Sequence, residues 1–459
     1  MKGRSANLPT APSLLKIIGP SFILLGLALG SGELLLWPYL AANYGLGLLW
    51  GALLGVSFQY VLNTEIMRYT LAWGESVFLG FRKLSRLWPI WFILSTFIPW
   101  SLPGIASASA QILVTLFPIL DQKIVTVLTL LLIGLILTLG KTLLKTMETW
   151  QRTVILVGVP FITGLTFIFA HPVDWQMALA GLLGQGDGWW LFPPNIGLFA
   201  FLGAFAYSGA GGNLNFAQTY YIKEEGFGMG KGTQKISSLL KSGRQAVHLE
   251  GKLFTDTAAN RQKWQQWWRV ITLEHFLVFA MIGFLTIFLL SVLAHSLVFG
   301  QETQQGLQFL FQEAEAISRL ASPVVGFIFL IVASQMLFST QLGILESSSR
   351  IISENSLLVF YKPGKSVDLS KSFYIALWGQ ILLGIIITLL GFEEPRLLIT
   401  LSAVLNAAAM MVAFPLIYWL NKQRLPEFIQ PSLWRKLVLG GAFLFFLIFV
   451  GLTIWNYVG

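Results

Sequence analysis

One carboxylate, Glu33, lies in the middle of a long apolar stretch, at the end of the segment Gly30-Ser31-Gly32-Glu33. A carboxylate at the centre of a membrane span costs about 2.5 to 3.5 kcal/mol, so such acids usually face a cavity, bind a cation or carry protons. We therefore predict that Glu33 is the central metal-binding or proton-binding residue. The alternative is that Glu33 is a structural partner of another buried group.

A second glycine cluster, Gly209-Ala210-Gly211-Gly212-Asn213, lies in the middle of another apolar stretch. Such sequences unwind a helix easily. Non-helical backbone at mid-membrane depth is tolerated only where it lines protein or a watery cavity, because unpaired amides facing lipid are costly. We predict helices broken at 30–33 and 209–213 that face each other across a cavity. The alternative is a pair of continuous helices that glycine allows to pack closely.

The groups around the two predicted breaks offer only oxygen ligands, from backbone carbonyls, hydroxyls and side-chain amides. The predicted binding residues are Gly30, Ser31, Gly32, Glu33, Tyr207, Ser208, Gly209, Ala210, Asn213, Asn215 and Asn406. For Tyr207 and Asn406, ordinary packing is the competing interpretation. Hard oxygen ligands suit Mg²⁺, Ca²⁺, Mn²⁺ or Na⁺ and give no special preference for softer metals.

The elements that position these residues must be membrane helices. Apolar residues make up 55% of the 459 positions and charged residues only 11%, which no water-soluble domain could bury. A span needs about 20 mostly apolar residues. We find eleven such stretches, near residues 14–43, 46–67, 88–117, 123–140, 150–170, 195–222, 269–298, 322–349, 372–391, 397–421 and 435–457. The chain has no cysteine, so thiolate metal sites are excluded.

The charges predict a topology. With a cytoplasmic N-terminus and an external C-terminus, every Lys and Arg falls on the inside except Lys123, Arg319 and Arg396, as the positive-inside rule requires. We therefore expect an integral protein of the cell (inner or plasma) membrane.

Two acid–base pairs with helical spacing lie near predicted cytoplasmic span ends. They are Glu65 with Arg68, and Glu346 with Arg350. A gating salt bridge and a plain interfacial pair are both consistent with this pattern.

The two predicted breaks lie in spans one and six. Because span six comes five spans after span one, an odd number, a second five-span unit enters the membrane from the opposite side, which makes an inverted repeat. Paired broken helices in inverted halves indicate a transporter's central site. We predict one polytopic domain, 1–459, with repeats at 14–170 and 195–421, an extra span at 435–457 and a cytoplasmic loop at 223–268.

At these residues the chain resembles the Nramp-related group of divalent metal transporters, within the LeuT-like five-plus-five transporters. The resemblance covers roughly residues 14 to 425. It rests on Gly30 to Glu33, on Leu48 to Leu54, on Arg68 to Gly74, on Gly226 to Gly230, on Phe338-Ser339-Thr340 and on Leu401 to Leu405. It implies an all-α membrane fold with discontinuous helices 1 and 6.

The chain departs from that family at the metal site. Family members read Asp-Pro-Gly-Asn in span one and Met-Pro-His in span six. Here Gly30 stands at the position of the metal-binding Asp, Glu33 at that of the Asn, and Ala210 at that of the Met, which supplies a thioether. Gly212 stands at the His, and Ala403 at a Gln of span ten that can complete the site. We therefore expect a hard cation in place of a thiophilic one.

The sequence predicts a secondary transporter that moves a hard divalent cation such as Mg²⁺ or Mn²⁺, with proton coupling as an option. The alternatives are a carrier of an amino acid or other small organic solute, because such carriers often have a Gly-Ser-Gly break in span one, and a non-transporting sensor. No enzyme motif such as Gly-x-Ser-x-Gly in a strand context or His-Glu-x-x-His occurs. We expect no enzyme activity, no cofactor beyond a transported cation, and a monomer whose partners are the bilayer and a small substrate, without nucleic acid.

Overall fold

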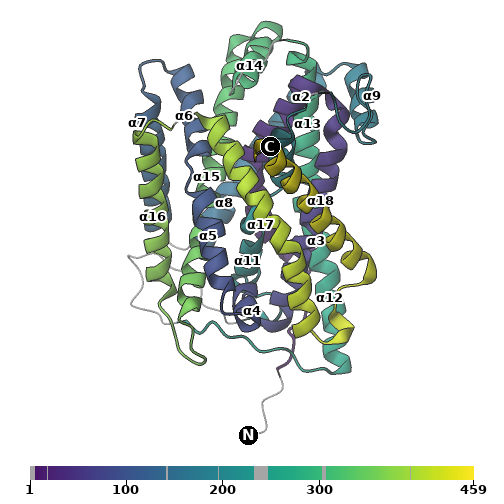
Figure 1. Cartoon of the computed structure of the whole chain (residues 1–459), viewed down its shortest axis with the longest axis vertical. Helices are drawn as coiled ribbons and strands as arrows, with labels where there is room; N and C mark the ends of the chain where they lie inside the picture. The colour runs from purple at the N-terminus through teal and green to yellow at the C-terminus, as the bar shows by residue number, and fades with distance from the viewer. Residues whose placement is uncertain are drawn as a thin grey trace.

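The computed structural model describes residues 6–17, 19–140, 143–194, 196–231, 247–301, 307–392 and 394–458. Figure 1 shows an elongated bundle of helices that run mostly along its long axis. Part of the predicted loop 223–268 lies outside the described residues, as do several of the predicted inside charges, namely Lys2, Arg4, Lys141, Lys235, Lys241 and Arg244.

The first five spans are built from seven α-helices, one π-helix and one short 3-10 helix. Span one comprises α1 (Pro20–Ala28), η2 (Leu29–Leu36) and α2 (Trp37–Tyr44); span two η3 (Leu46–Leu48) and α3 (Leu49–Trp73); span three α5 (Trp88–Trp100) and α6 (Gly104–Leu116); span four α7 (Gln122–Leu139); span five α8 (Leu143–Phe169).

The remaining spans follow the same order along the chain. Span six comprises α10 (Leu198–Ala206), η4 (Gly212–Ala217) and α11 (Gln218–Glu224); span seven α12 (Ala258–His275), η6 (Phe276–Met281) and α13 (Ile282–Val298); spans eight to eleven are α15 (Pro323–Val359), α16 (Leu369–Leu389), α17 (Pro395–Arg424) and α18 (Leu433–Val458).

Short elements join the spans at the two ends of the bundle. They are η1 (Leu14–Lys16), α4 (Val77–Leu84), α9 (Pro172–Gly181), η5 (Gly228–Gly230), α14 (Gln308–Leu320) and η7 (Glu427–Ile429). In Figure 1, α4 and the first turns of α12 lie at the end that also holds the N-terminus, and α9 and α14 lie at the opposite end.

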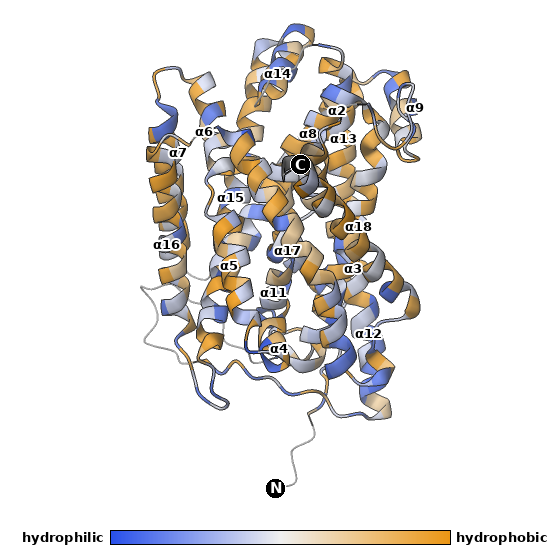
Figure 2. Ribbon diagram, viewed as in Figure 1, coloured by the Kyte–Doolittle hydropathy of each residue, from blue (hydrophilic) through white to orange (hydrophobic). Residues whose placement is uncertain are grey.

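Among the described residues, ten helices are long and apolar enough to cross a membrane. Span six is interrupted and makes the eleventh, so the predicted all-α membrane protein with about eleven spans is confirmed. The lengths of the spans and the hydrophobic residues along them, orange in Figure 2, identify an integral membrane protein.

The predicted limits of span three, 88–117, agree with the observed span Trp88–Leu116. This span is divided, because α5 ends at Trp100 and Pro103 precedes the start of α6. One predicted boundary was wrong: the segment before span seven, expected to be loop up to residue 268, becomes helical eleven residues earlier, at Ala258. Thr257 caps α12 by accepting a hydrogen bond from the Asn260 backbone N–H, so the polar segment before span seven is already helical.

The central helix of the bundle is α15, which packs against α5, α6, α16 and η2. Span one also packs on spans five and seven, through α1 with α8 and α2 with α13. On the other side, α17 packs against α10, and α18 covers α17 and α3. Spans one and six therefore lie in the interior, where their polar residues are shielded from lipid.

Candidate functional site

The break in span six lies where it was predicted. The helix α10 ends at Ala206, and the chain becomes helical again at Gly212. Gly211 has φ of 76° and Gly212 has φ of 52°. Side chains rarely tolerate this left-handed conformation, so glycine is required here to turn the chain within the membrane.

Gln59 of span two supplies partners for the backbone that the break frees. Its Nε2 donates to the carbonyl oxygen of Ala206 at 3.1 Å, and its Oε1 accepts from the N–H of Gly211 at 3.2 Å. One buried amide thus replaces two hydrogen bonds that a continuous helix would have made. The sequence prediction missed Gln59, although an amide within an apolar span is a signal that could have revealed it.

Span one is not broken, contrary to the prediction. From Leu29 to Leu36 it forms a π-helix, with wider turns than an α-helix, and it continues directly into α2. The glycines serve close approach. A Cβ on Gly32 would overlap the carbonyl oxygen of Tyr207, and a Cβ on Gly30 would lie 2.8 Å from Oγ1 of Thr340. The alternative of a glycine-packed continuous helix is therefore correct for span one.

Glu33 is buried, with 1% of its surface exposed. Its Oε1 faces span seven, 3.4 Å from the Cβ position of Gly283, and the Thr286 hydroxyl is its hydrogen-bonding neighbour. Its Oε2 has no hydrogen-bond partner in the described part of the chain, and no Lys or Arg among the described residues pairs with it. The described residues also contain no group of three or more His, Cys, Asp or Glu that could hold a metal.

A cluster of neutral polar groups lies on the other side of the span-six break. The hydroxyl of Tyr207 lies 2.8 Å from Oγ of Ser402, and Nδ2 of Asn406 donates to that hydroxyl at 3.1 Å. The ring of Trp100 stacks on the Tyr207 ring at a centroid distance of 5.5 Å. Oδ1 of Asn406 has no hydrogen-bond partner in the described chain and faces the Cα of Gly212.

A small cavity adjoins this cluster, lined by Trp100, Tyr207, Gln341 and Ser402 together with apolar residues of spans three, eight and ten. Its volume is about 10 Å³, which is about the space of one water by this measure. The centre of the molecule is therefore almost fully closed in this conformation.

The other predicted residues occupy separate positions around the break. Oγ of Ser208 accepts from Nε1 of Trp37 at 3.0 Å. Nδ2 of Asn213 donates to the hydroxyls of Ser95 and Thr96 in span three, at 2.8 and 3.0 Å.

Asn215 is turned back on its own segment. Its Nδ2 donates to the Gly212 carbonyl at 3.2 Å. The amide oxygens of Asn213 and Asn215 have no hydrogen-bond partner among the described residues. Ser31, Gly209 and Ala210 are buried. The structure therefore brings Tyr207 and Asn406 together but directs Glu33 toward span seven, away from them.

Both predicted acid–base pairs exist, and each joins more elements than the sequence suggested. Glu65 accepts from Nε of Arg68 at 2.8 Å, from Arg435 of span eleven at 3.0 Å and from Asn421 of span ten at 3.0 Å. The Arg68 guanidinium also stacks on Trp268.

The second pair connects spans six and eight. Arg350 forms ion pairs with Glu346 and with Glu224 at the end of α11, and the Tyr221 hydroxyl donates to Oε2 of Glu346 at 3.0 Å. All of these side chains are buried. They are therefore not plain interfacial pairs.

At the opposite end of the bundle, a different contact joins spans one and ten. Arg396 at the start of α17 donates to the Tyr39 hydroxyl at 2.7 Å and lies over its ring. A cavity of about 20 Å³ adjoins this contact, between spans one, six and ten and α14.

Solved structures of other proteins have the same arrangement of helices. The chain superposes on the crystal structures of two mutants of the Eremococcus coleocola manganese transporter. For one, the TM-score is 0.72 at 16% identity, covering 99% of this chain and 91% of that chain; for the other, the TM-score is 0.71 at 16% identity, covering 97% and 88%. It also matches Mhp1, a nucleobase-cation-symport-1 family transporter with bromovinylhydantoin bound, with a TM-score of 0.56 at 10% identity over 99% and 96% of the two chains.

The chain has the LeuT-like transporter fold. These superpositions confirm the predicted resemblance to the Nramp-related group at the level of the fold. No protein-family model and no curated protein sequence matches the chain.

Proposed function

We propose that this protein is a secondary transporter that moves a small, hard cation across the membrane, with Glu33 as its central charged ligand. The observation that carries this proposal is the burial of Glu33 without a cationic partner. A buried carboxylate that lacks a counter-ion in the protein is expected to bind a cation or a proton.

The ligand chemistry supports a hard cation. Glu33 offers one carboxylate, and the unpartnered amide oxygens of Asn213, Asn215 and Asn406 offer neutral oxygen at separate positions around the span-six break. Mg²⁺ is usually held by one or two carboxylates and keeps several waters, which fits a site with a single acid. Ala210 contributes no sulfur that would favour a softer metal.

The fold supports alternating access. In a five-plus-five transporter, one group of helices rocks against the other around a central site. The Glu224–Arg350–Glu346 group joins span six to span eight at one end, and the Tyr39–Arg396 contact joins span one to span ten at the other. We propose that these contacts, with Glu65 and Arg68, act as the gates. The end with the N-terminus is proposed to be cytoplasmic, in the cell membrane.

The proposal is tested by transport into liposomes that contain the purified protein. Mg²⁺ uptake should be saturable, and Mg²⁺ or Ca²⁺ should compete effectively with Mn²⁺. Glu33→Gln should abolish uptake or its pH dependence. Glu315→Gln, the same change at an exposed position of α14, is the matched control and should transport normally. Tight, selective Mn²⁺ binding measured by calorimetry would contradict the assignment to hard cations.

A small organic solute is the second candidate, favoured by the kind of side chains that meet at the centre, namely Trp100, Tyr207, Gln341 and Ser402, around a cavity that would have to widen to admit it. An aromatic face and neutral hydrogen-bonding groups suit a planar or zwitterionic molecule better than a bare ion. Labelled amino acids and nucleobases in the same liposomes separate the two. Uptake that Tyr207→Phe reduces and Mg²⁺ does not inhibit would favour the organic solute. Absence of uptake for every candidate would favour a sensor.

A further inference from the structure

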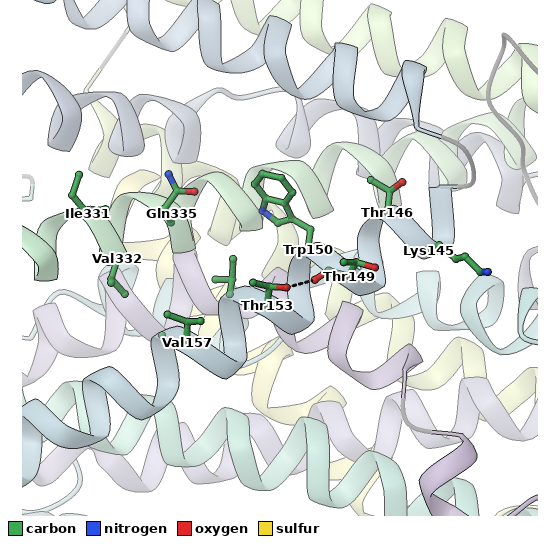
Figure 3. Close-up of a pocket in the computed structure, with 11 residues that line it drawn as sticks. Lys145, Thr146, Thr149, Trp150, Thr153, Val157, Ile331, Val332 and Gln335 are labelled. Carbon is green, nitrogen blue, oxygen red and sulfur yellow. Dashed lines mark hydrogen bonds between the residues drawn. The ribbon is translucent and has the colours of Figure 1, made fainter.

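A groove in the outer surface of the bundle lies between span five and span eight. Its volume is about 760 Å³. Trp150, Val154, Val157 and Val332 form much of its apolar lining, and Figure 3 shows these helices side by side with Trp150 between them. Val157 is 60% exposed. Because α8 is a membrane span, this exposed surface faces the lipid.

One end of the groove is polar and basic. Lys145 lies there, and Thr149 and Thr153 follow on α8 (Figure 3), where the Thr153 hydroxyl donates to the Thr149 carbonyl at 2.8 Å. Arg152 does not line the groove, but it follows Lys145 by two helical turns and projects from the same side of α8. Both are exposed, and neither forms an ion pair with a described residue.

One residue that lines the groove, Trp150, carries an unpartnered donor. Nε1 of Trp150 is buried and has no hydrogen-bond partner in the described part of the chain. An indole N–H that is shielded in this way usually finds an acceptor. An acceptor oxygen brought by a bound molecule would supply it.

The basic end lies at one membrane surface. Glu148, one turn after Lys145, comes within 3.2 Å of the Cβ position of Gly19, immediately before span one. Lys145 therefore lies at the side of the membrane where span one begins. A cation at the surface above an apolar groove matches the shape of a phospholipid, with its charged headgroup and its buried chains.

We propose that this groove binds one anionic glycerophospholipid. The phosphate and its anionic headgroup lie against Lys145 and Arg152, the glycerol ester oxygens lie near Thr149 and Trp150, and one acyl chain runs along Val157 and Val332. The lipid bridges span five and span eight, which Gln151 and Ser339 already fasten by two hydrogen bonds of 2.7 and 2.8 Å. This assignment does not depend on the transported substrate.

The test is native mass spectrometry of the full-length protein in mild detergent, titrated with phosphatidylglycerol or with phosphatidylcholine of the same acyl chains. Wild type should retain one phosphatidylglycerol more tightly than any phosphatidylcholine. Lys145→Ala with Arg152→Ala should weaken phosphatidylglycerol binding by roughly tenfold or more, since two basic residues near an anionic headgroup are removed.

Two further variants test separately whether the effect is specific to the basic residues at the groove and whether the acyl chain occupies the groove. Lys436→Ala removes an exposed lysine from the start of α18, outside the groove, and should leave binding unchanged. Val157→Trp fills the groove from an exposed position, so the protein should remain monodisperse on size exclusion while losing the bound lipid.

Equal retention of the two lipids, or a loss in Lys436→Ala as large as in the double variant, overturns the proposal. Binding that only Val157→Trp affects also overturns it, because the groove would then accept acyl chains without recognising the headgroup.

Discussion

Spans one and six both contain a glycine cluster at mid-span, but glycine is needed for a different structural reason in each. In span six, Gly211 and Gly212 have positive φ, and the helix is interrupted. In span one the backbone stays helical, and Gly32 leaves room for the Tyr207 carbonyl of span six. One cluster is needed for a backbone conformation and the other for a contact. The two clusters are connected, because the carbonyl next to Gly32 belongs to Tyr207, the first residue after the end of α10.

The same two spans each contain a buried carboxylate, and these also differ. Glu224 at the end of span six is paired with Arg350. Glu33 in span one has no ionic partner among the described residues and has a free oxygen. A paired acid fastens two helices, whereas an unpaired one is available to a ligand.

The largest effect is expected for Gly32→Ala. The new methyl would overlap backbone atoms of Tyr207, which no rotamer change can move aside, so we expect a loss of about 3 kcal/mol and a clear fall in the melting temperature in detergent. Gly164→Ala is the matched control, because no atom lies within 4 Å of its Cβ position. If both variants melt alike, spans one and six do not touch at Gly32.

Glu224→Gln should cost about 2 kcal/mol. Arg350 keeps Glu346 as a partner but loses one of its two charge-assisted contacts in a buried setting. The loss should appear as a lower melting temperature and as faster proteolysis at the end with α4. The double variant Glu224→Gln with Arg350→Met should recover part of the loss. A further fall in the double variant would show that the ion pair is not the reason.

Gly212→Ala should cost about 1 to 2 kcal/mol, the penalty of a left-handed backbone for a residue with a Cβ. The Cβ would also overlap Oδ1 of Asn406, but that side chain can move. Combining it with Asn406→Gly removes Oδ1, Cγ and Cβ of residue 406, which are the three atoms nearest the new methyl, and retains the backbone strain at residue 212, so most of the loss relative to Asn406→Gly alone should remain. Full recovery would assign the need for glycine to contact, as in span one, and would remove the difference between the spans.

Gln59→Leu should cost about 1 kcal/mol, since hydrogen bonds between membrane helices contribute about 0.6 kcal/mol each and Gln59 makes two across the break. Hydrogen exchange at the Gly211 amide should increase in this variant. Gln380→Leu, which removes an amide joining spans eight and nine, should leave that exchange unchanged. Protection at Gly211 that survives Gln59→Leu would mean another group supports the break.

The sequence predicted the spans and the break in span six because apolar length and glycine clustering act locally. It could not separate a glycine needed for φ from a glycine needed for contact, since the difference at Gly32 lies in a carbonyl from another span. Contacts between distant spans also explain why Gln59 was missed. The direction in which the Glu33 side chain points could not be predicted either, because it depends on how α13 packs against span one. The ion-pair prediction identified Glu346 and Arg350, four residues apart, but not Glu224, which is distant in sequence.

The smallest effect on stability is expected for Glu33→Gln. If Glu33 balanced a buried cation of the protein, its neutralisation would cost roughly 3 to 5 kcal/mol. No described Lys or Arg pairs with it, so we expect the melting temperature to change by little, within the shift that about 0.5 kcal/mol produces. The informative measurement is melting against Mg²⁺ concentration. A ligand that binds only the folded state raises stability with concentration, so the wild type should shift upward with Mg²⁺ and Glu33→Gln should not. A large loss of stability without Mg²⁺ would make Glu33 a structural residue like Glu224, and the contrast between the two spans would then rest on the glycines alone.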